Sequence, residues 1–197
     1  MARLVIVSNR VQVPTERGAR AGGLAVALAD ALTPGSMWFG WSGRRGQETG
    51  KTAKVVVHGD VSYATIDLSE SHYRRFYVGF SNGSLWPLLH YRTGLLDYRG
   101  DDYEGYLAVN EAYAAALAPL LQPDDLIWIH DYQLLAMAAA LRRRGVRNRI
   151  GFFLHIPFVP PAVLYVLPPA IEIVTAMMAA DVIGFQTEGD RSNFLES

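Results

Sequence analysis

The feature that most constrains the fold is a pair of short apolar runs that each end on polar residues. Leu126–Ile129 ends on the pair His130-Asp131, and Gly151–Leu154 ends on His155. Such runs, bounded by polar segments, are typical of strands buried on both faces of a parallel sheet. The stretch between them, Tyr132–Arg144, is predicted to be a helix. The sequence therefore predicts a strand–helix–strand unit whose polar ends lie at one edge of a sheet.

The rest of the chain continues this alternation. Further strands are predicted at Leu4–Val7, Met37–Trp41, Lys54–Val57, Val61–Ile66 and Val182–Phe185, and helices at Leu24–Leu32, Ser69–Val78, Tyr103–Leu121, between Pro161 and Ala180, and from about Thr187. Strands that alternate with helices predict an α/β fold: a Rossmann-like, doubly wound, mainly parallel sheet flanked by helices. The 197 residues suffice for one such domain or for half of a two-domain protein.

Composition excludes several classes of protein. Half of the residues are hydrophobic and 19% are charged, which supports a packed core and argues against disorder. The net charge is −1, and the one basic run, Arg142–Arg144, ends a predicted helix, where cations are favourable, so nucleic-acid binding is not indicated. The absence of cysteine excludes disulfides and thiolate metal sites. With no signal-peptide pattern and no membrane-length apolar stretch, we expect a cytoplasmic protein with no membrane partner.

Three strand ends carry polar side chains that a ligand can use. Besides His130-Asp131 and His155, the triplet Ser8-Asn9-Arg10 follows the strand Leu4–Val7. Ligands of open α/β sheets bind at the carboxyl ends of the strands. A single polar residue in this place can also be a helix cap or part of a turn. Three such ends together favour a ligand-binding face.

Two further features indicate a sugar-phosphate pocket. Gly22 and Gly23 stand just before the helix that begins at Leu24, and N–H groups at a helix N-terminus favour an anion. Arg10 leaves the first strand toward the same side, and guanidinium is a preferred partner of phosphate. Trp41, at a strand end, is a candidate flat surface for a sugar ring. The glycine pair matches no dinucleotide or Walker pattern and can equally be only a turn.

Longer motifs make a resemblance specific. They are Ser8-Asn9-Arg10, Ala21-Gly22-Gly23-Leu24, Trp38 to Gly43, Phe80-Ser81-Asn82, Leu85-Trp86-Pro87, Tyr103 to Tyr106, Trp128 to Tyr132, Phe153 to Phe158 and Gly184 to Thr187. In this order they resemble the N-terminal half of the trehalose-6-phosphate synthase family. The resemblance implies one half of a retaining B-type glycosyltransferase, in which two Rossmann-like domains face each other across a cleft. It implies transfer of glucose from the co-substrate UDP-glucose to glucose 6-phosphate, with no metal and no other cofactor.

The resemblance also implies roles for single residues. Arg10, Tyr77 and Trp86 would contact the acceptor phosphate, and Trp41 and Asp131 would surround the acceptor glucose. Gly22 and Gly23 would contact the donor diphosphate, and His155 would touch the donor sugar. Asp131 and His155 are the candidate catalytic residues. Asp131 would orient the sugar, because in such enzymes the leaving phosphate is expected to take the proton of the acceptor.

The chain also departs from the family. Residues 1–197 correspond to the acceptor-side domain, so we expect the C-terminal nucleotide-sugar domain to be absent and the chain alone to be inactive. Gln133 stands where the family usually has His. The nucleotide base of the donor stays open, as does whether the truncation is natural or engineered. A sister transferase on the same scaffold, such as a glucosylglycerol-phosphate synthase, stays an alternative.

The segment Val159–Ala180 is apolar almost throughout, with Glu172 as its only charge. It is either a helix buried in the core or an exposed patch that forms an interface. The second alternative predicts a homo-oligomer of unknown size, most simply a dimer. The residues expected in that contact are Val163, Val166, Ile171 and Val174. It also leaves open a different role, that of an isolated or engineered Rossmann-like domain that self-associates through Pro161–Met178.

Overall fold

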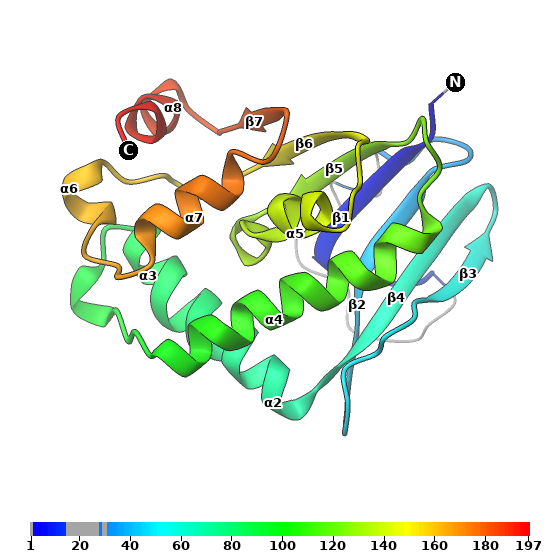
Figure 1. Ribbon diagram of the computed structural model, residues 1–197, viewed down its shortest axis with the longest axis horizontal. Helices are drawn as coiled ribbons and strands as arrows, with labels where there is room; N and C mark the ends of the chain where they lie inside the picture. Colours follow the sequence, from blue (N-terminus) through cyan, green and yellow to red (C-terminus); the bar gives the residue numbers. More distant parts are fainter. Residues whose placement is uncertain (1, 15–27, 29–30) are drawn as a thin grey trace.

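The centre of the computed structural model, which describes residues 2–14, 28 and 31–197, is a seven-stranded sheet (Figure 1). Its strands are β1 (Leu4–Arg10), β2 (Met37–Gly46), β3 (Lys54–His58), β4 (Val61–Ser69), β5 (Leu126–His130), β6 (Arg149–Phe153) and β7 (Val182–Gly184). They lie in the order β3-β4-β2-β1-β5-β6-β7. β3 is antiparallel to β4, and each other neighbouring pair is parallel. The predicted α/β fold with a mainly parallel sheet is confirmed.

Helical elements connect the strands. They are α2 (Glu70–His72), the π-helix η1 (Tyr73–Leu85), α3 (Trp86–Leu89), α4 (Gly100–Leu117), α5 (Met137–Arg143), α6 (Pro161–Leu164), α7 (Ala170–Met177) and α8 (Glu188–Leu195). The short 3-10 turns are η2 (Thr93–Leu95), η3 (Ala118–Leu120) and η4 (Tyr132–Leu134). α4 and α5 lie side by side, and α7 follows next to α5 (Figure 1). None of the described helices is long and apolar enough to cross a membrane.

The alternation of side chains along β1 explains why its sequence is apolar without a break. Val5 and Val7 belong to the large core formed with the helices named above, whereas Ile6 belongs to a smaller core on the other side, together with Trp38 and Tyr63. Successive side chains of a strand point to opposite faces. Both faces of the central strand are therefore buried, as the short apolar runs predict.

Two predicted helix starts are confirmed by their caps. The Ser69 side chain accepts a hydrogen bond from the backbone N–H of His72 at 3.1 Å. The Thr187 side chain accepts one from the backbone N–H of Asp190 at 3.2 Å. Each satisfies a donor that the first turn of a helix leaves unpaired. The predicted helix Leu24–Leu32 falls largely outside the described residues.

The largest difference from the prediction is η1. The predicted helix stops at Val78, whereas the structure continues through Leu85 as a π-helix and runs directly into α3. Gly79 allows η1 to pack closely on α4, because a Cβ there would lie 2.4 Å from the Asp102 carboxyl group. Gly105 does the same from the α4 side, where a Cβ would lie 2.4 Å from Arg75. Wide π-turns are rare and are frequently found at functional sites.

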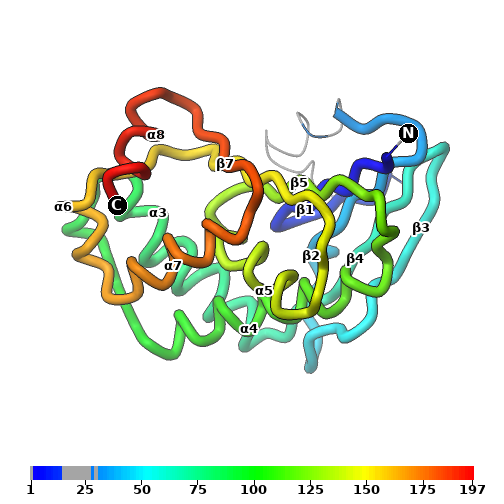
Figure 2. The backbone as a smooth tube through the Cα atoms, turned by 45° about the horizontal axis from the view of Figure 1, so that its top comes forward, coloured from blue at the N-terminus to red at the C-terminus, as the bar shows by residue number. Residues whose placement is uncertain are grey.

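The apolar segment Val159–Ala180 divides between core and surface. Ile173 and Val174 of α7 are buried in the large core, so the prediction that Val174 contributes to an interface is wrong. Ile171, on the other side of α7, is 69% exposed, and Val166 is exposed as well. Figure 2 shows α6 and α8 at the end of the molecule opposite β3. Both alternatives, a core helix and an exposed apolar patch, therefore hold in part for α7, because one apolar side points into the core and the other toward solvent.

Candidate active site

Four predicted site residues lie at the carboxyl ends of neighbouring strands. Arg10 ends β1 and is paired in register with Trp41 of β2. Asp131 follows β5 on the other side of β1, and His155 lies just beyond β6. The predicted ligand-binding face therefore exists as a geometric feature. We call Arg10, Trp41, Asp131 and His155 the carboxyl edge.

A row of rings joins Arg10 to Tyr77. The Arg10 guanidinium lies 5.9 Å from the centre of the Trp41 ring, which lies 5.3 Å from the ring of Tyr73. Tyr73 in turn stacks on Tyr77 at 5.6 Å. Gly43, at φ 87°, leaves room for Arg10, because a Cβ there would lie 2.8 Å from a guanidinium nitrogen. Trp41 is only 7% exposed, so little of its ring is available to a ligand.

The π-helix brings Tyr77 and Trp86 to the same side. In an α-helix of 3.6 residues per turn, residues nine apart lie on opposite sides. A π-helix has about 4.4 residues per turn, so they are about two full turns apart and lie on one side. Along η1, α3 and the residue that follows α3, five polar or ring-bearing residues recur every four or five positions. They are Tyr73, Tyr77, Asn82, Trp86 and His90, and the buried residues Phe76, Phe80, Leu85 and Leu89 follow the same spacing.

A hydrogen bond with η4, the turn that follows β5 and Asp131, shows that this side faces the carboxyl edge. Tyr132, next to Asp131, donates a hydrogen bond from its hydroxyl to Asn82 Oδ1 at 2.8 Å. Burial raises the pKa of Tyr132, and the charges of Asp131 and Tyr77 raise it further. His90 stacks on Trp86 with 4.2 Å between the ring centroids, and it lies close enough to Asp131 to lower the pKa of that carboxyl group. No role is predicted from the sequence for Tyr73, Asn82 or His90, although their spacing is a detectable signal.

Asp131 has a strained backbone. Its φ of 76° and ψ of 168° fall in a region that is essentially restricted to glycine. Its N–H donates to the Phe153 carbonyl at 2.9 Å, and its carboxylate accepts the backbone N–H of His155 at 3.3 Å. Burial raises the pKa of Asp131, while hydrogen bonds from the backbone N–H groups of Tyr132 and His155 oppose that rise. Such strain occurs where a surrounding structure holds a functional side chain in place.

His155 is held by His130 and Gln186 as well as by Asp131. Its Nε2 lies 2.9 Å from Nδ1 of His130, and its carbonyl oxygen accepts a hydrogen bond of 2.6 Å from the Gln186 side chain. Asp190, buried at the start of α8, accepts the N–H of Phe158 in the same loop at 2.8 Å. Burial lowers the pKa of both histidines, and for His130 to about 3. Both imidazoles are therefore neutral near pH 7.

The buried His130 predicts a loss of stability in acid. Its pKa is about 3 in the folded chain, below the ordinary 6.5, so the unfolded chain binds more protons between these values. The unfolding free energy should fall as the pH drops below about 6.5, by about 2 kcal/mol at pH 4.5 from His130 alone. Urea unfolding at about pH 7 and at about pH 4.5 measures this loss of unfolding free energy. His130→Asn cannot titrate and should lose about 2 kcal/mol less; equal losses would contradict the assignment.

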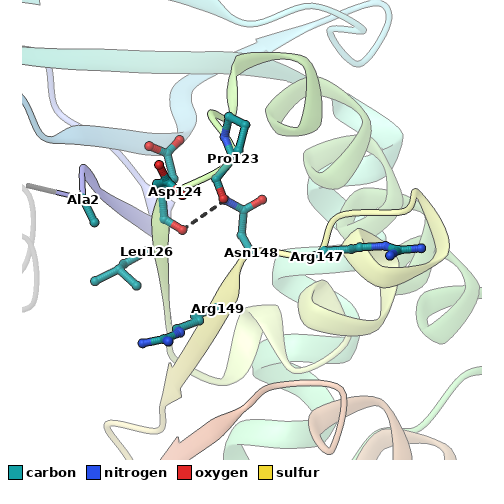
Figure 3. A pocket seen from close by; sticks show the side chains of 8 residues that line it. Ala2, Pro123, Asp124, Leu126, Arg147, Asn148 and Arg149 are labelled. Carbon is teal, nitrogen blue, oxygen red and sulfur yellow. Dashed lines mark hydrogen bonds between the residues drawn. The ribbon is translucent and has the colours of Figure 1, made fainter.

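Two of the predicted site residues are not among the described ones. Gly22 and Gly23 fall outside the described residues, and Trp86 is 36% exposed beside His90. A cavity of about 680 Å³ lies at the opposite, amino-terminal edge of the sheet (Figure 3). Its two arginines, Arg147 and Arg149, point away from each other there, so they do not converge on one ligand. Among the described residues no group of His, Asp and Glu is placed to hold a metal.

Comparison with known proteins gives one consistent result. Residues 2–197 match the model of glycosyltransferase family 20. The whole chain is 49% identical to a trehalose-6-phosphate synthase of Enterobacter sp. (strain 638) and 50% identical to one of Citrobacter koseri. It spans 42% and 41% of the lengths of these two relatives.

Solved structures agree with the sequences. A UDP-forming α,α-trehalose-phosphate synthase from Burkholderia xenovorans, in complex with glucose-6-phosphate, superposes with a TM-score of 0.93 at 51% identity. A protein from E. coli bound with UDP-2-fluoro glucose superposes with a TM-score of 0.90 at 48% identity. Each match covers 99% of this chain, and 43% and 42% of the respective structures.

Proposed function

The chain belongs to glycosyltransferase family 20, and from this membership and the carboxyl edge we propose that it forms the acceptor-side part of a trehalose-6-phosphate synthase. The proposed reaction transfers glucose from UDP-glucose to glucose 6-phosphate with retention of configuration. The observation that carries the proposal is that four predicted site residues lie toward the carboxyl ends of the strands. They are Arg10, Tyr77, Trp86 and Asp131. The chain spans about two-fifths of its relatives, so the activity is proposed for the protein that holds both parts.

The chemistry of the edge supports a sugar phosphate as the acceptor. Guanidinium and phenol form charge-assisted hydrogen bonds with phosphate oxygens, and Arg10 is exposed beside the ring of Trp41. Asp131, when ionised, accepts hydrogen bonds from hydroxyl groups and so orients the sugar. Gly22 and Gly23 remain proposed contacts of the donor diphosphate, and His155 of the donor sugar. Independence from a metal, and a cytoplasmic location, likewise stay predictions.

Assay of transfer tests the proposal directly. The protein that holds both parts should form UDP and trehalose 6-phosphate from UDP-glucose and glucose 6-phosphate. Formation of a product only with glycerol 3-phosphate would favour the sister transferase instead. No transfer to either acceptor would contradict both functions. The chain of 197 residues alone should show no turnover, because catalysis by two facing domains needs the donor held on the other side of the cleft.

Arg10→Ala should weaken binding of glucose 6-phosphate to this chain. A hydrogen bond to a charged group is worth roughly 1.5–3 kcal/mol, and each 1.4 kcal/mol corresponds to about tenfold in affinity. We expect a dissociation constant of about millimolar for the unchanged chain, because a partial pocket makes few contacts, and a value at least about tenfold weaker for the variant. Titration followed by NMR measures both constants.

Arg149→Ala provides the matched control for this titration. Arg149 is exposed, forms no ion pair with a described residue and lies at the amino-terminal start of β6, at the opposite edge of the sheet. The two variants lose the same charge, so a difference between them reports position rather than net charge. Equal affinities for the two variants would show that Arg10 does not bind the phosphate.

We also propose that the exposed side of α7 supports self-association, as the sequence predicts. Ile171 and Met178 are 69% and 68% exposed on this side. Burial of apolar surface yields about 25 cal/mol per Å², and a two-fold contact uses the same face twice. The mass in solution should therefore exceed that of one chain, and Ile171→Glu with Met178→Glu should reduce it. Val57→Glu, at an equally exposed valine of β3, is the control. A monomeric unchanged chain would end this proposal.

A further inference from the structure

The hydrogen bond between His130 and His155 determines what His155 can offer a ligand. The two atoms are His130 Nδ1 and His155 Nε2, 2.9 Å apart. A neutral imidazole carries hydrogen on only one of its nitrogens, so one ring donates and the other accepts. If His155 accepts at Nε2, its own hydrogen lies on Nδ1, and its free nitrogen is a donor. If His155 donates, its free nitrogen is an acceptor.

The buried end of His130 decides the direction. Nε2 of His130 is buried and has no hydrogen-bond partner among the described residues. The His130 ring packs against the ring of Trp128, with 4.3 Å between the two ring centroids. A hydrogen on this Nε2 would point into the core with at most a weak contact to that ring. Because buried N–H groups without an acceptor are rarer than unused acceptors, the hydrogen belongs on Nδ1 of His130.

We propose that His130 is a positioning residue that holds His155 in the Nδ1–H tautomer, so that the His155 ring acts as a hydrogen-bond donor at the carboxyl edge. The backbone on both sides of that ring is fixed, because Asp131 accepts the N–H of His155 and Gln186 donates to its carbonyl. Ionised Asp131 accepts hydrogen bonds, so the edge presents a donor beside an acceptor. This pair suits two hydroxyl groups of one sugar, a reading that rests on the proposed function.

The tautomer itself can be measured without any assay of transfer. In protein labelled with ¹⁵N at histidine, long-range ¹H–¹⁵N correlation spectra distinguish a protonated from an unprotonated ring nitrogen. At pH 7 we expect both His130 and His155 to carry hydrogen on Nδ1. Hydrogen on Nε2 of His155 would overturn the proposal. Since this readout needs only the folded chain, it stands or falls independently of the proposed function.

Two variants of similar shape test the role of His130. In His130→Asn the new amide group has an N–H close to the original Nδ1. In His130→Asp the new carboxylate, when ionised, has only hydrogen-bond acceptors. The Asn variant should keep hydrogen on Nδ1 of His155, and transfer should stay within about threefold of the unchanged protein. The Asp variant should move the hydrogen to Nε2 of His155 and lower kcat/KM at least tenfold. A mere packing role for His130 would leave the spectra of the two variants alike.

The outcomes separate the two proposals. Absence of transfer in the unchanged protein, with hydrogen on Nδ1 of His155, contradicts the proposed function and leaves the tautomer assignment intact. Loss of transfer in the Asn variant with an unchanged spectrum would show that the tautomer is not what His130 contributes. If the Asp variant does not fold, the unchanged protein and the Asn variant still decide the question.

Discussion

Replacing Asp131 with glycine should stabilise the fold. The backbone of Asp131, at φ 76° and ψ 168°, costs about 1–3 kcal/mol for a residue with a side chain. Its carboxylate is also buried, which raises its pKa. Glycine removes both of these costs. Against this gain, it loses the 3.3 Å hydrogen bond with His155, and the greater chain entropy of glycine favours the unfolded state by about 0.5–1 kcal/mol. We expect the unfolding free energy, measured in urea, to rise by about 1 kcal/mol.

The same change should abolish most of the transfer activity. A hydrogen bond to an ionised carboxylate is worth roughly 1.5–3 kcal/mol, and the acceptor sugar would also lose its orientation. We expect kcat/KM of the protein that holds both parts to fall by about 100-fold or more. Stability and activity should thus change in opposite directions. This is expected of a side chain held in a strained conformation for function.

Asp131→Asn separates the strain from the charge. Asparagine has nearly the size of aspartate and tolerates positive φ better than most residues, so the strain should remain. We expect an unfolding free energy within about 0.5 kcal/mol of the unchanged chain, and a loss of transfer similar to that of the glycine variant. A glycine variant destabilised by more than about 1 kcal/mol would refute the strain. Full transfer by either variant would remove Asp131 from the site.

The sequence predicts the sheet and its functional edge because both follow from local patterns. Leu126–Ile129 and Gly151–Leu154 are predicted to be buried on both faces, but only one face of each strand is buried in the large core and the other is partly exposed. The polar residues after them fall at one edge because parallel strands share a direction. The helix starts at Ser69 and Thr187 are equally local, since each cap depends on a side chain and an N–H three residues further on. These features need no knowledge of distant contacts.

The remaining features depend on contacts that no local pattern encodes. Tyr77 and Trp86 share one side only because the helix is a π-helix, and its close packing on α4 involves Gly79 and Gly105. Helical periodicity at 3.6 residues per turn would place them on opposite sides. The positive φ of Asp131 is imposed by its neighbours, since aspartate alone does not prefer it. The two faces of α7 likewise follow from what packs against it.

Gly40→Ala, next to Trp41 of the carboxyl edge, should strongly destabilise the chain. A Cβ on Gly40 of β2 would lie 2.2 Å from the carbonyl oxygen of Ser8 in β1 and 3.1 Å from the Val11 side chain. The first of these atoms belongs to the backbone of a central strand, which cannot turn aside as a side chain can. Overpacking a core costs about 1–3 kcal/mol even where side chains adjust. We expect a loss of about 3 kcal/mol or more in the unfolding free energy.

Gly94→Ala is the matched control, because a Cβ there meets nothing within 4 Å and Gly94 has no positive φ. It should change the unfolding free energy by no more than about 0.5 kcal/mol. If enough of the Gly40→Ala chain folds, its affinity for glucose 6-phosphate should also fall, since Trp41 follows Gly40 and pairs with Arg10. Unchanged stability with unchanged affinity would mean that β1 and β2 do not approach this closely. The alignment of Arg10 with Trp41 would then need another cause.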